Sequence, residues 1–217
     1  MNPRSASISS SSDVAFTPSV KSVQERRGSR KGYANMEAKG GWATSVSPDL
    51  AAFIAEVRSF YLATASADGQ PYIQHRGGPK GFLHVLNGKT LAFADFSGNR
   101  QYITTGNLAE NSRAFIFLMD YANRRRVKLW GSARVVEDDP DLMRRLTVEG
   151  YRGRPEQVIV FTLEAWDTNC PQHIPQMVFV EDIKEAVDAL KNRIARLEQE
   201  NAALQAAQGS TEQRGEA

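Results

Sequence analysis

The sequence has little cysteine, no long apolar run and no strong excess of one charge. Cys170 is the only cysteine of the 217 residues, so no disulfide can form within the chain and nothing indicates export. The longest purely apolar run, Ala114 to Met119, is far shorter than the roughly 20 residues that a membrane-spanning helix requires. A formal net charge of +2 disfavours a surface built mainly to bind nucleic acid. These absences favour a cytoplasmic protein without a membrane partner.

Most common catalytic and metal-binding motifs are also missing. There is no Gly-x-Gly-x-x-Gly after a strand, no phosphate-binding Walker loop and no Gly-x-Ser-x-Gly elbow. The histidines are His75, His84 and His173, and only Cys170 and His173 are spaced like metal ligands. Because one such pair cannot close a zinc site, we expect no metal.

The positive charge that is present is concentrated near the N-terminus. Residues 1–31 hold six basic side chains against Asp13 and Glu25, and the first dozen residues are rich in serine and free of acids. This composition predicts a disordered tail over residues 1–16, with an organellar transit peptide as the alternative. The triplet Arg124-Arg125-Arg126 could contact nucleic-acid phosphates, but no aromatic stacking platform accompanies it, so nucleic acid is not the expected partner.

Residues 17–58 form a segment with helical signals. Thr17-Pro18 and Ser47-Pro48 each place a capping residue before a proline at the first helical position. Gly28 and the pair Gly40-Gly41 indicate breaks between short helices. The second capped segment continues with apolar residues at helical spacing, namely Leu50, Phe53, Ile54 and Val57.

From residue 59 to residue 176 the pattern changes to that of strands. Asp68-Gly69 and Asn87-Gly88 each separate two strand-like segments and predict hairpins, because these residues tolerate the backbone angles of tight turns. Ala114–Met119 suits a strand buried on both faces, and residues 127–135 alternate between apolar and polar side chains. Residues 158–166 are a further strand candidate, and helices are expected over residues 99–110 and 140–146. This pattern predicts a mainly β fold with some α, a barrel with flanking helices.

A heptad repeat occupies residues 180–207. Its apolar positions step by four and three, which favours a parallel two-stranded coiled coil with Asn201 setting a dimeric register. An amphipathic helix folded onto its own barrel is the alternative. Residues 208–217 are expected to be a disordered tail. The repeat consists of Ile183, Val187, Leu190, Ile194, Leu197, Asn201 and Leu204.

Two segments combine turns with cationic side chains at strand ends. In residues 74–82 a glycine-rich bend lies between Arg76 and Lys80, and its backbone N–H groups are exposed for hydrogen bonding. In residues 95–101 Gly98 turns the chain and a helix is expected to begin at Asn99 or Arg100. A helix N-terminus beside an arginine suits a phosphate monoester. Taken singly, each segment could be an ordinary loop.

Together and in this order, the segments resemble the pyridoxamine 5′-phosphate oxidase-like family of flavin-binding split β-barrels. The resemblance runs from Phe60 to Ile174 and is similar above all to the subfamily with an Arg-Gly-Gly-Pro bend, here Arg76–Pro79. The family implies a Greek-key split barrel and a homodimer with flavin mononucleotide (FMN) at the subunit interface. The segments that carry the resemblance are residues 69–83, 93–101, 107–113, 126–135 and 169–175.

The family pattern also implies the residues that contact FMN. The strand from Gln74 to Lys80 would line the isoalloxazine ring and supply cationic contacts, and Arg100 is the expected phosphate ligand. Gln101 replaces a lysine of the family, and Arg126, which replaces a glutamine, could restore that charge. The implied cofactor-binding residues are Gln74, His75, Arg76, Gly77, Lys80, Ala94, Asp95, Asn99, Arg100, Gln101, Arg126 and Trp166.

The resemblance implies an FMN-dependent oxidoreductase that acts on an unidentified small substrate. The true oxidases carry an Arg-x-His element near the C-terminus that holds their substrate, whereas this chain has Gln172-His173-Ile174-Pro175, so oxidation of pyridoxamine phosphate is not expected. No catalytic acid or base can be named; His75, His173 and Cys170 are candidates only because they titrate or react. The alternative is a non-catalytic flavin or haem carrier or sensor whose coiled coil mediates dimerisation.

Overall fold

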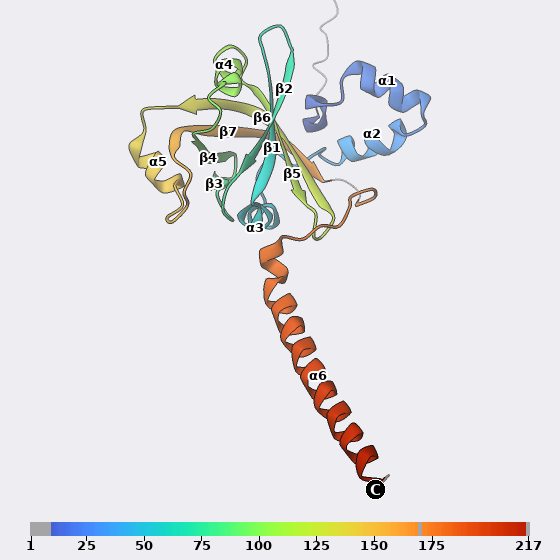
Figure 1. The fold of residues 1–217 in the computed structure, drawn as a ribbon. Coiled ribbons are helices and arrows are strands. Elements are labelled where there is room, and N and C mark those ends of the chain that lie inside the picture. The colour runs from blue at the N-terminus through green and yellow to red at the C-terminus, as the bar shows by residue number, and fades with distance from the viewer. Residues whose placement is uncertain (1–9, 169–170, 216–217) are drawn as a thin grey trace, which may run out of the picture. The chain divides into compact units, whose positions relative to one another are not determined.

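The computed structural model describes residues 10–168 and 171–215, which divide into two compact units at Ile174/Pro175. The first unit is a seven-stranded antiparallel sheet with short helices around it (Figure 1). Its strand order is β2-β1-β5-β6-β7-β4-β3, and the sheet curls into a split β-barrel. The strands are β1 (Ser59–Ala65), β2 (Pro71–Gly77), β3 (His84–Asn87), β4 (Thr90–Phe96), β5 (Arg113–Asp120), β6 (Arg125–Val136) and β7 (Pro155–Thr168).

Both predicted hairpins are confirmed. β1 and β2 pair around Asp68-Gly69, where Gly69 has a φ of 92°, a backbone angle that residues with a side chain rarely adopt. β3 and β4 pair around Asn87-Gly88. The alternating segment 127–135 lies within β6, whose residues alternate between buried and half-buried as predicted.

The predicted helix starts before residue 58 are also present. Thr17 accepts a hydrogen bond from the backbone N–H of Val20, and Ser47 accepts one from that of Leu50. The helices of the first unit are α1 (Pro18–Arg26), α2 (Arg30–Ala38), α3 (Pro48–Glu56), α4 (Ile103–Glu110) and α5 (Pro140–Leu146), and a 3₁₀ helix, η1, spans Ser11–Val14.

The main core fills the barrel. Phe60, Leu62, Ile116 and Leu129 are at most 1% exposed and belong to one cluster, which α3 closes with Leu50. A smaller cluster forms on the outer face of β4 and β7, because α5 packs there. The middle of β7 is therefore buried on both faces. The second cluster contains Ala92, Ala94, Leu146, Val158 and Val160.

β5 is not buried on both faces, so that prediction is wrong for the single chain. Its residues alternate, with Ala114, Ile116 and Leu118 in the barrel and Phe115 and Phe117 half-buried on the outer face. The outer face is covered only in part, for example where the ring of Phe115 contacts Trp130 at a centroid distance of 5.1 Å. An aromatic outer face is thus left accessible.

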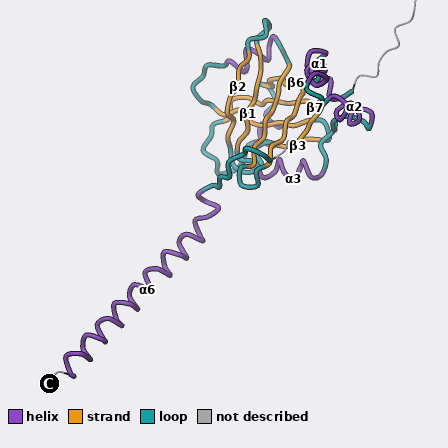
Figure 2. The backbone as a smooth tube through the Cα atoms, turned by 90° about the vertical axis from the view of Figure 1, so that its right-hand side faces the viewer, coloured by secondary structure: helices purple, strands orange, loops and turns teal. Residues whose placement is uncertain are grey.

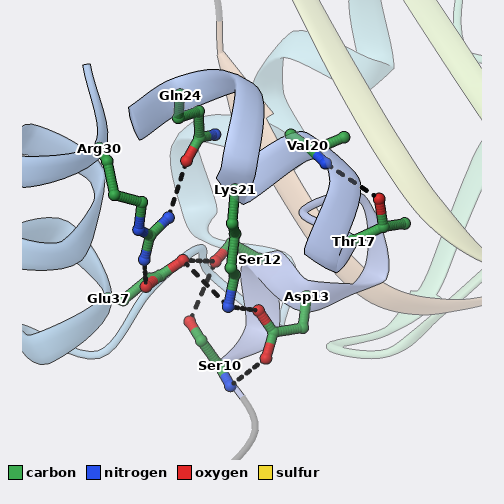
Figure 3. Close-up of polar contacts among 9 residues, drawn as sticks. All are labelled: Ser10, Ser12, Asp13, Thr17, Val20, Lys21, Gln24, Arg30 and Glu37. Carbon is green, nitrogen blue, oxygen red and sulfur yellow. Dashed lines mark hydrogen bonds and ion pairs between the residues drawn. The ribbon is translucent and has the colours of Figure 1, made fainter. Parts of the chain in front are cut away.

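The predicted disordered tail is wrong for residues 10–16. There η1 is held by polar contacts with the following helices: Asp13 forms an ion pair with Lys21 of α1 (Figure 3), and Ser12 is fully buried. The Ser11 hydroxyl also donates to the carbonyl of Trp42 at 2.7 Å. Glu37 receives hydrogen bonds from Ser12 and Arg30. A tertiary polar network therefore orders a segment whose local composition is typical of disorder. Residues 1–9 lie outside the described part of the chain.

The second unit is dominated by α6 (Val180–Gly215), a continuous 36-residue helix (Figure 2). The backbone is helical well beyond residue 207, so the disordered tail predicted for residues 208–217 is wrong as far as Gly215. Within the described residues, no helix is long and apolar enough to span a membrane.

Candidate functional site

A polar cavity of about 250 Å³ opens where the edge strand β2 faces the end of β4. The strand β2 contributes alternate side chains, and the loop after β4 and the start of α4 form the rest of the wall. Six of the residues that the sequence predicts meet here: Gln74, Arg76, Asp95, Asn99, Arg100 and Gln101. The remaining lining residues are Tyr72, Phe96, Gly98, Tyr102, Ile103, Thr104, Thr105 and Glu156.

An ion pair between Arg76 and Asp95 forms part of the cavity wall. It joins β2 to β4, which are not neighbours in the sheet, and the two side chains are only 10% and 12% exposed. The other oxygen of Asp95 accepts a hydrogen bond from Gln157 Nε2 at 2.8 Å, and the same amide group lies 2.9 Å from the hydroxyl of Thr105. This network ties the edge strand, β7 and α4 together.

Arg76 also keeps one free donor in this wall. Among the described residues, its Nε is buried and has no hydrogen-bond partner, and its guanidinium lies 5.8 Å from the ring centroid of Phe93. Burial lowers the pKa of Arg76, while the negative charge of Asp95 opposes that change. A buried N–H without a partner is costly, and Arg76 is one of the residues that line the cavity.

The segment after β4 differs from its prediction. α4 begins at Ile103 rather than at Asn99 or Arg100, because Arg100 and Tyr102 adopt left-handed backbone angles, with φ of 59° and 53°, that no α-helix accepts. The side chain of Asn99 accepts a hydrogen bond from the backbone N–H of Gln101 at 3.3 Å and so stabilises a turn instead. Gln101 therefore precedes the helix as part of the cavity wall.

The two cationic side chains of the cavity have different surroundings. The charge of Arg76 is offset by Asp95, whereas Arg100 is exposed and its Nε–H donates to the Tyr102 hydroxyl at 3.2 Å. The hydrogen bond to Tyr102 and the negative charge of Glu156 raise the pKa of Arg100, which stays cationic. Among the described residues no side chain caps the start of α4, and the first N–H groups of a helix have no acceptor within the helix. The lip of the cavity therefore suits an anion.

Three other predicted residues of the glycine-rich segment do not line this cavity. His75 alternates to the opposite face of β2, where its ring packs against Tyr61 at 5.6 Å between centroids. Gly77 ends the strand opposite Ser59. Lys80 forms an ion pair with Glu56 at 2.8 Å. The period of two along a strand explains the position of His75.

The last three predicted residues also lie elsewhere. Ala94 is 2% exposed in the cluster beneath α5. Arg126 pairs with Met119 across β5 and β6, and its Nε is buried without a partner among the described residues. Trp166 donates its indole N–H to the carbonyl of Ser45 at 2.8 Å.

Several residues of the site could not be identified from the sequence around them. Thr104 and Thr105 belong to α4, and the Thr104 hydroxyl donates to Gln74 at 2.9 Å. Gln157, which does not line the cavity but donates to Asp95 of the wall, comes from β7 and lies opposite Asp95 in the β4–β7 register. One clue was available, since Gln157 is a polar residue directly before the apolar run 158–161. Cys170 lies outside the described residues, and within them no group of three or more histidine, cysteine, aspartate or glutamate side chains could hold a metal ion.

Comparisons with solved structures show distant similarity. HupZ of Group A Streptococcus is 17% identical, with 61% of this chain and 99% of that chain covered and a TM-score of 0.48. An FMN-binding protein from Syntrophomonas wolfei is 13% identical (67% and 97% covered, TM-score 0.42). HutZ, the heme storage protein of Vibrio cholerae, is 16% identical (56% and 93% covered, TM-score 0.39).

The sequence itself matches a known family over the barrel. No curated protein sequence matches the chain. Residues 46–170, however, match the family described as Pyridoxamine 5′-phosphate oxidase. That range is more than half of the chain and includes all seven strands and the whole cavity wall. The chain belongs to the pyridoxamine 5′-phosphate oxidase family.

Proposed function

We propose that the chain binds FMN in the cavity between β2 and β4 and acts as a flavin-dependent oxidoreductase on a small substrate. The observation that carries the proposal is the buried, unpartnered Nε of Arg76 in a polar wall whose lip carries the exposed cation Arg100. FMN matches both features, because its ring offers carbonyl and nitrogen acceptors and its side chain ends in a phosphate.

The donors present fit this cofactor. Arg76 would donate to an acceptor on the ring, and Asp95 and Gln157 would hold the guanidinium in place for that contact. Arg100 and the uncapped start of α4 would bind the phosphate. Bound flavin supplies hydride transfer at its N5, while these side chains bind it, orient it and keep their own charges balanced.

The proposed assembly is a homodimer in which a second chain completes the site. Pockets that enclose small molecules usually measure about 300–1,000 Å³, and the cavity of one chain holds only about 250 Å³. Ile73, which is 61% exposed, and the half-buried Phe115 and Phe117 offer a surface for the partner on the face of β2 and β5 opposite to the cavity, so a partner seated there would reach the cavity around the edge strand β2. A patch of aromatic and apolar side chains of this kind is typical of an interface.

A flavin carrier without turnover is the second candidate. Asp95, the buried carboxylate of the wall, is already held by Arg76 and Gln157 and is not placed to move a proton for a substrate. Haem is the weaker cargo for this cavity, because none of its described lining residues is a histidine or a cysteine.

An absorption spectrum of the purified protein, followed by titration of the stripped protein with FMN and with riboflavin, tests the proposal. Arg100→Ala should weaken FMN binding by roughly tenfold to a hundredfold and leave riboflavin binding unchanged, because riboflavin lacks the phosphate. Arg144→Ala, which removes an exposed arginine of α5, is the matched control. Absence of saturable FMN binding would refute the proposal. Bleaching of the bound flavin by a nicotinamide nucleotide, with reoxidation by an acceptor, would separate an enzyme from a carrier.

A further inference from the structure

An exposed apolar stripe runs along α6. Val187 and Ile194 are 37% and 54% exposed, and the leucines Leu190, Leu197 and Leu204 are 63%, 45% and 62% exposed. The stripe extends one turn beyond the repeat described above, because Val180, at the first residue of the helix, is 73% exposed. Large exposed apolar surfaces with a fixed helical spacing mark protein–protein contacts.

A single helix of this kind is not expected to be stable in water by itself. Helices in proteins owe most of their stability to the packing of an apolar face, and isolated helices are marginal. Every α6 residue from Val180 to Gln205 is exposed, so the described residues of the second unit supply no packing for the apolar face of the helix. The helical state therefore requires a partner surface.

We propose that α6 pairs with α6 of a second copy of this chain as a parallel, in-register two-stranded coiled coil. The stripe alternates between two core positions of the heptad. The first position holds β-branched residues (Val180, Val187, Ile194) and the second mostly leucine, a combination that favours a parallel coiled coil of two helices. Asn201 takes the first position in the last heptad. In a parallel register two Asn201 side chains meet and hydrogen-bond, whereas an antiparallel pair would bury each amide against an aliphatic residue.

The flanking charges agree with the same arrangement. In a parallel dimer Arg193 of one helix lies beside Glu198 of the other, which gives two attractive contacts by symmetry. The remaining flanking positions bring no like charges together, since Lys191 faces Ala186 and Glu200 faces Gln205. The occupant of the stripe is therefore a second copy of the chain.

This pairing is separate from the flavin site. α6 lies outside the residues that match the family, 46–170, and the proposal uses no contact of the cavity. FMN titration and the experiments below can therefore fail independently of one another.

Disulfide trapping tests the register. In a Cys170→Ser background, Leu204→Cys places one thiol on the stripe near its far end, and Gln199→Cys places one on the opposite face as the control. A parallel pair brings the two thiols introduced at position 204 together, and oxidation should link them at least about tenfold faster than the control. In an antiparallel pair they would be about 36 Å apart, from 24 residues at 1.5 Å each. Linking no faster than the control would overturn the proposal.

A second experiment measures whether the stripe stabilises the helix. Leu190→Asp with Leu197→Asp should abolish the concentration-dependent melting of helical circular dichroism, while Asn192→Asp with Gln199→Asp adds the same charge on the outer face and should leave it intact. Tryptophan fluorescence checks that the barrel stays folded, because all three tryptophans lie before residue 170. Equal melting of the two double variants would overturn the proposal. The proposal would also be overturned if Leu190→Asp with Leu197→Asp lost its helix while the Leu204→Cys protein failed to form a disulfide.

Discussion

Removing the carboxylate of the Arg76–Asp95 pair is the sharpest perturbation of the cavity. Asp95→Ala leaves the guanidinium of Arg76 without its counter-ion and removes one of the two acceptors of the Gln157 amide. We expect the barrel to lose stability, because the buried positive charge of Arg76 is then left without a counter-ion.

The size of the loss follows from burial. Breaking a buried ion pair by removing one partner costs about 3–5 kcal/mol. Both side chains retain a tenth of their accessible surface, at 10% and 12%, so some hydration of Arg76 persists. We therefore expect a loss at the lower end, about 3 kcal/mol for Asp95→Ala. Replacing both partners, as Arg76→Met with Asp95→Leu, removes the uncompensated charge and should return stability to within about 1 kcal/mol of the parent.

Equilibrium urea unfolding followed by tryptophan fluorescence measures these values, since the three tryptophans report on the barrel and not on α6. The double variant serves as the control for a general effect of mutation. If Asp95→Ala lowers the free energy of unfolding by less than about 0.5 kcal/mol, the size of an ordinary surface change, the Arg76–Asp95 pair is solvated and does not hold the cavity wall. A double variant as unstable as the single one would refute the charge argument itself.

Two further predictions concern the rest of the barrel unit. Burial would raise the pKa of Glu37, but the hydrogen bond from Arg30 and the nearby positive charges lower it below its ordinary value of 4.5. The N-terminal helices should therefore lose stability as the pH falls below 4.5. Glu37→Gln should cost about 2 kcal/mol of stability at pH 7 and should abolish this pH dependence in acid-unfolding curves. A Cβ on Gly131 would lie 2.0 Å from the carbonyl oxygen of Thr162, so Gly131→Ala should cost about 2–3 kcal/mol in urea unfolding. Gly88→Ala, which meets open space, should cost far less, and equal losses at the two glycines would contradict the steric argument.

The elements with local signals could be predicted from the sequence. Gly69, with its φ of 92°, carries the backbone freedom that its turn requires, and the Asn87 side chain stabilises the other turn by accepting a hydrogen bond from the backbone N–H of Lys89 at 2.9 Å. Thr17 and Ser47 mark helix starts because a hydroxyl one residue before a proline satisfies a free N–H. In each case the information lies within a few residues of the structure that it determines.

Features that depend on distant partners could not be predicted in this way. Gln157 contacts the wall residue Asp95 only because β7 pairs with β4 in a register that puts the two residues opposite each other. The family pattern implies both His75 and Arg76 as cofactor contacts, yet neighbouring residues of a strand point to opposite faces. The start of α4 was misplaced because left-handed residues at Arg100 and Tyr102 leave no pattern in composition.

The position of the cavity follows from the way the sheet ends. β2 is an edge strand, and an edge left open exposes unpaired backbone groups that favour aggregation. The pair between Arg76 and Asp95 ties this edge to a strand that is not its neighbour, by side chains rather than by a backbone ladder. Strands joined by backbone hydrogen bonds would lie directly side by side, whereas β2 and β4, joined by a side-chain ion pair, leave a space between them. That space is the cavity. The same contacts that restrain the open edge therefore create the polar wall, so a substitution that weakens them should change stability and ligand binding together.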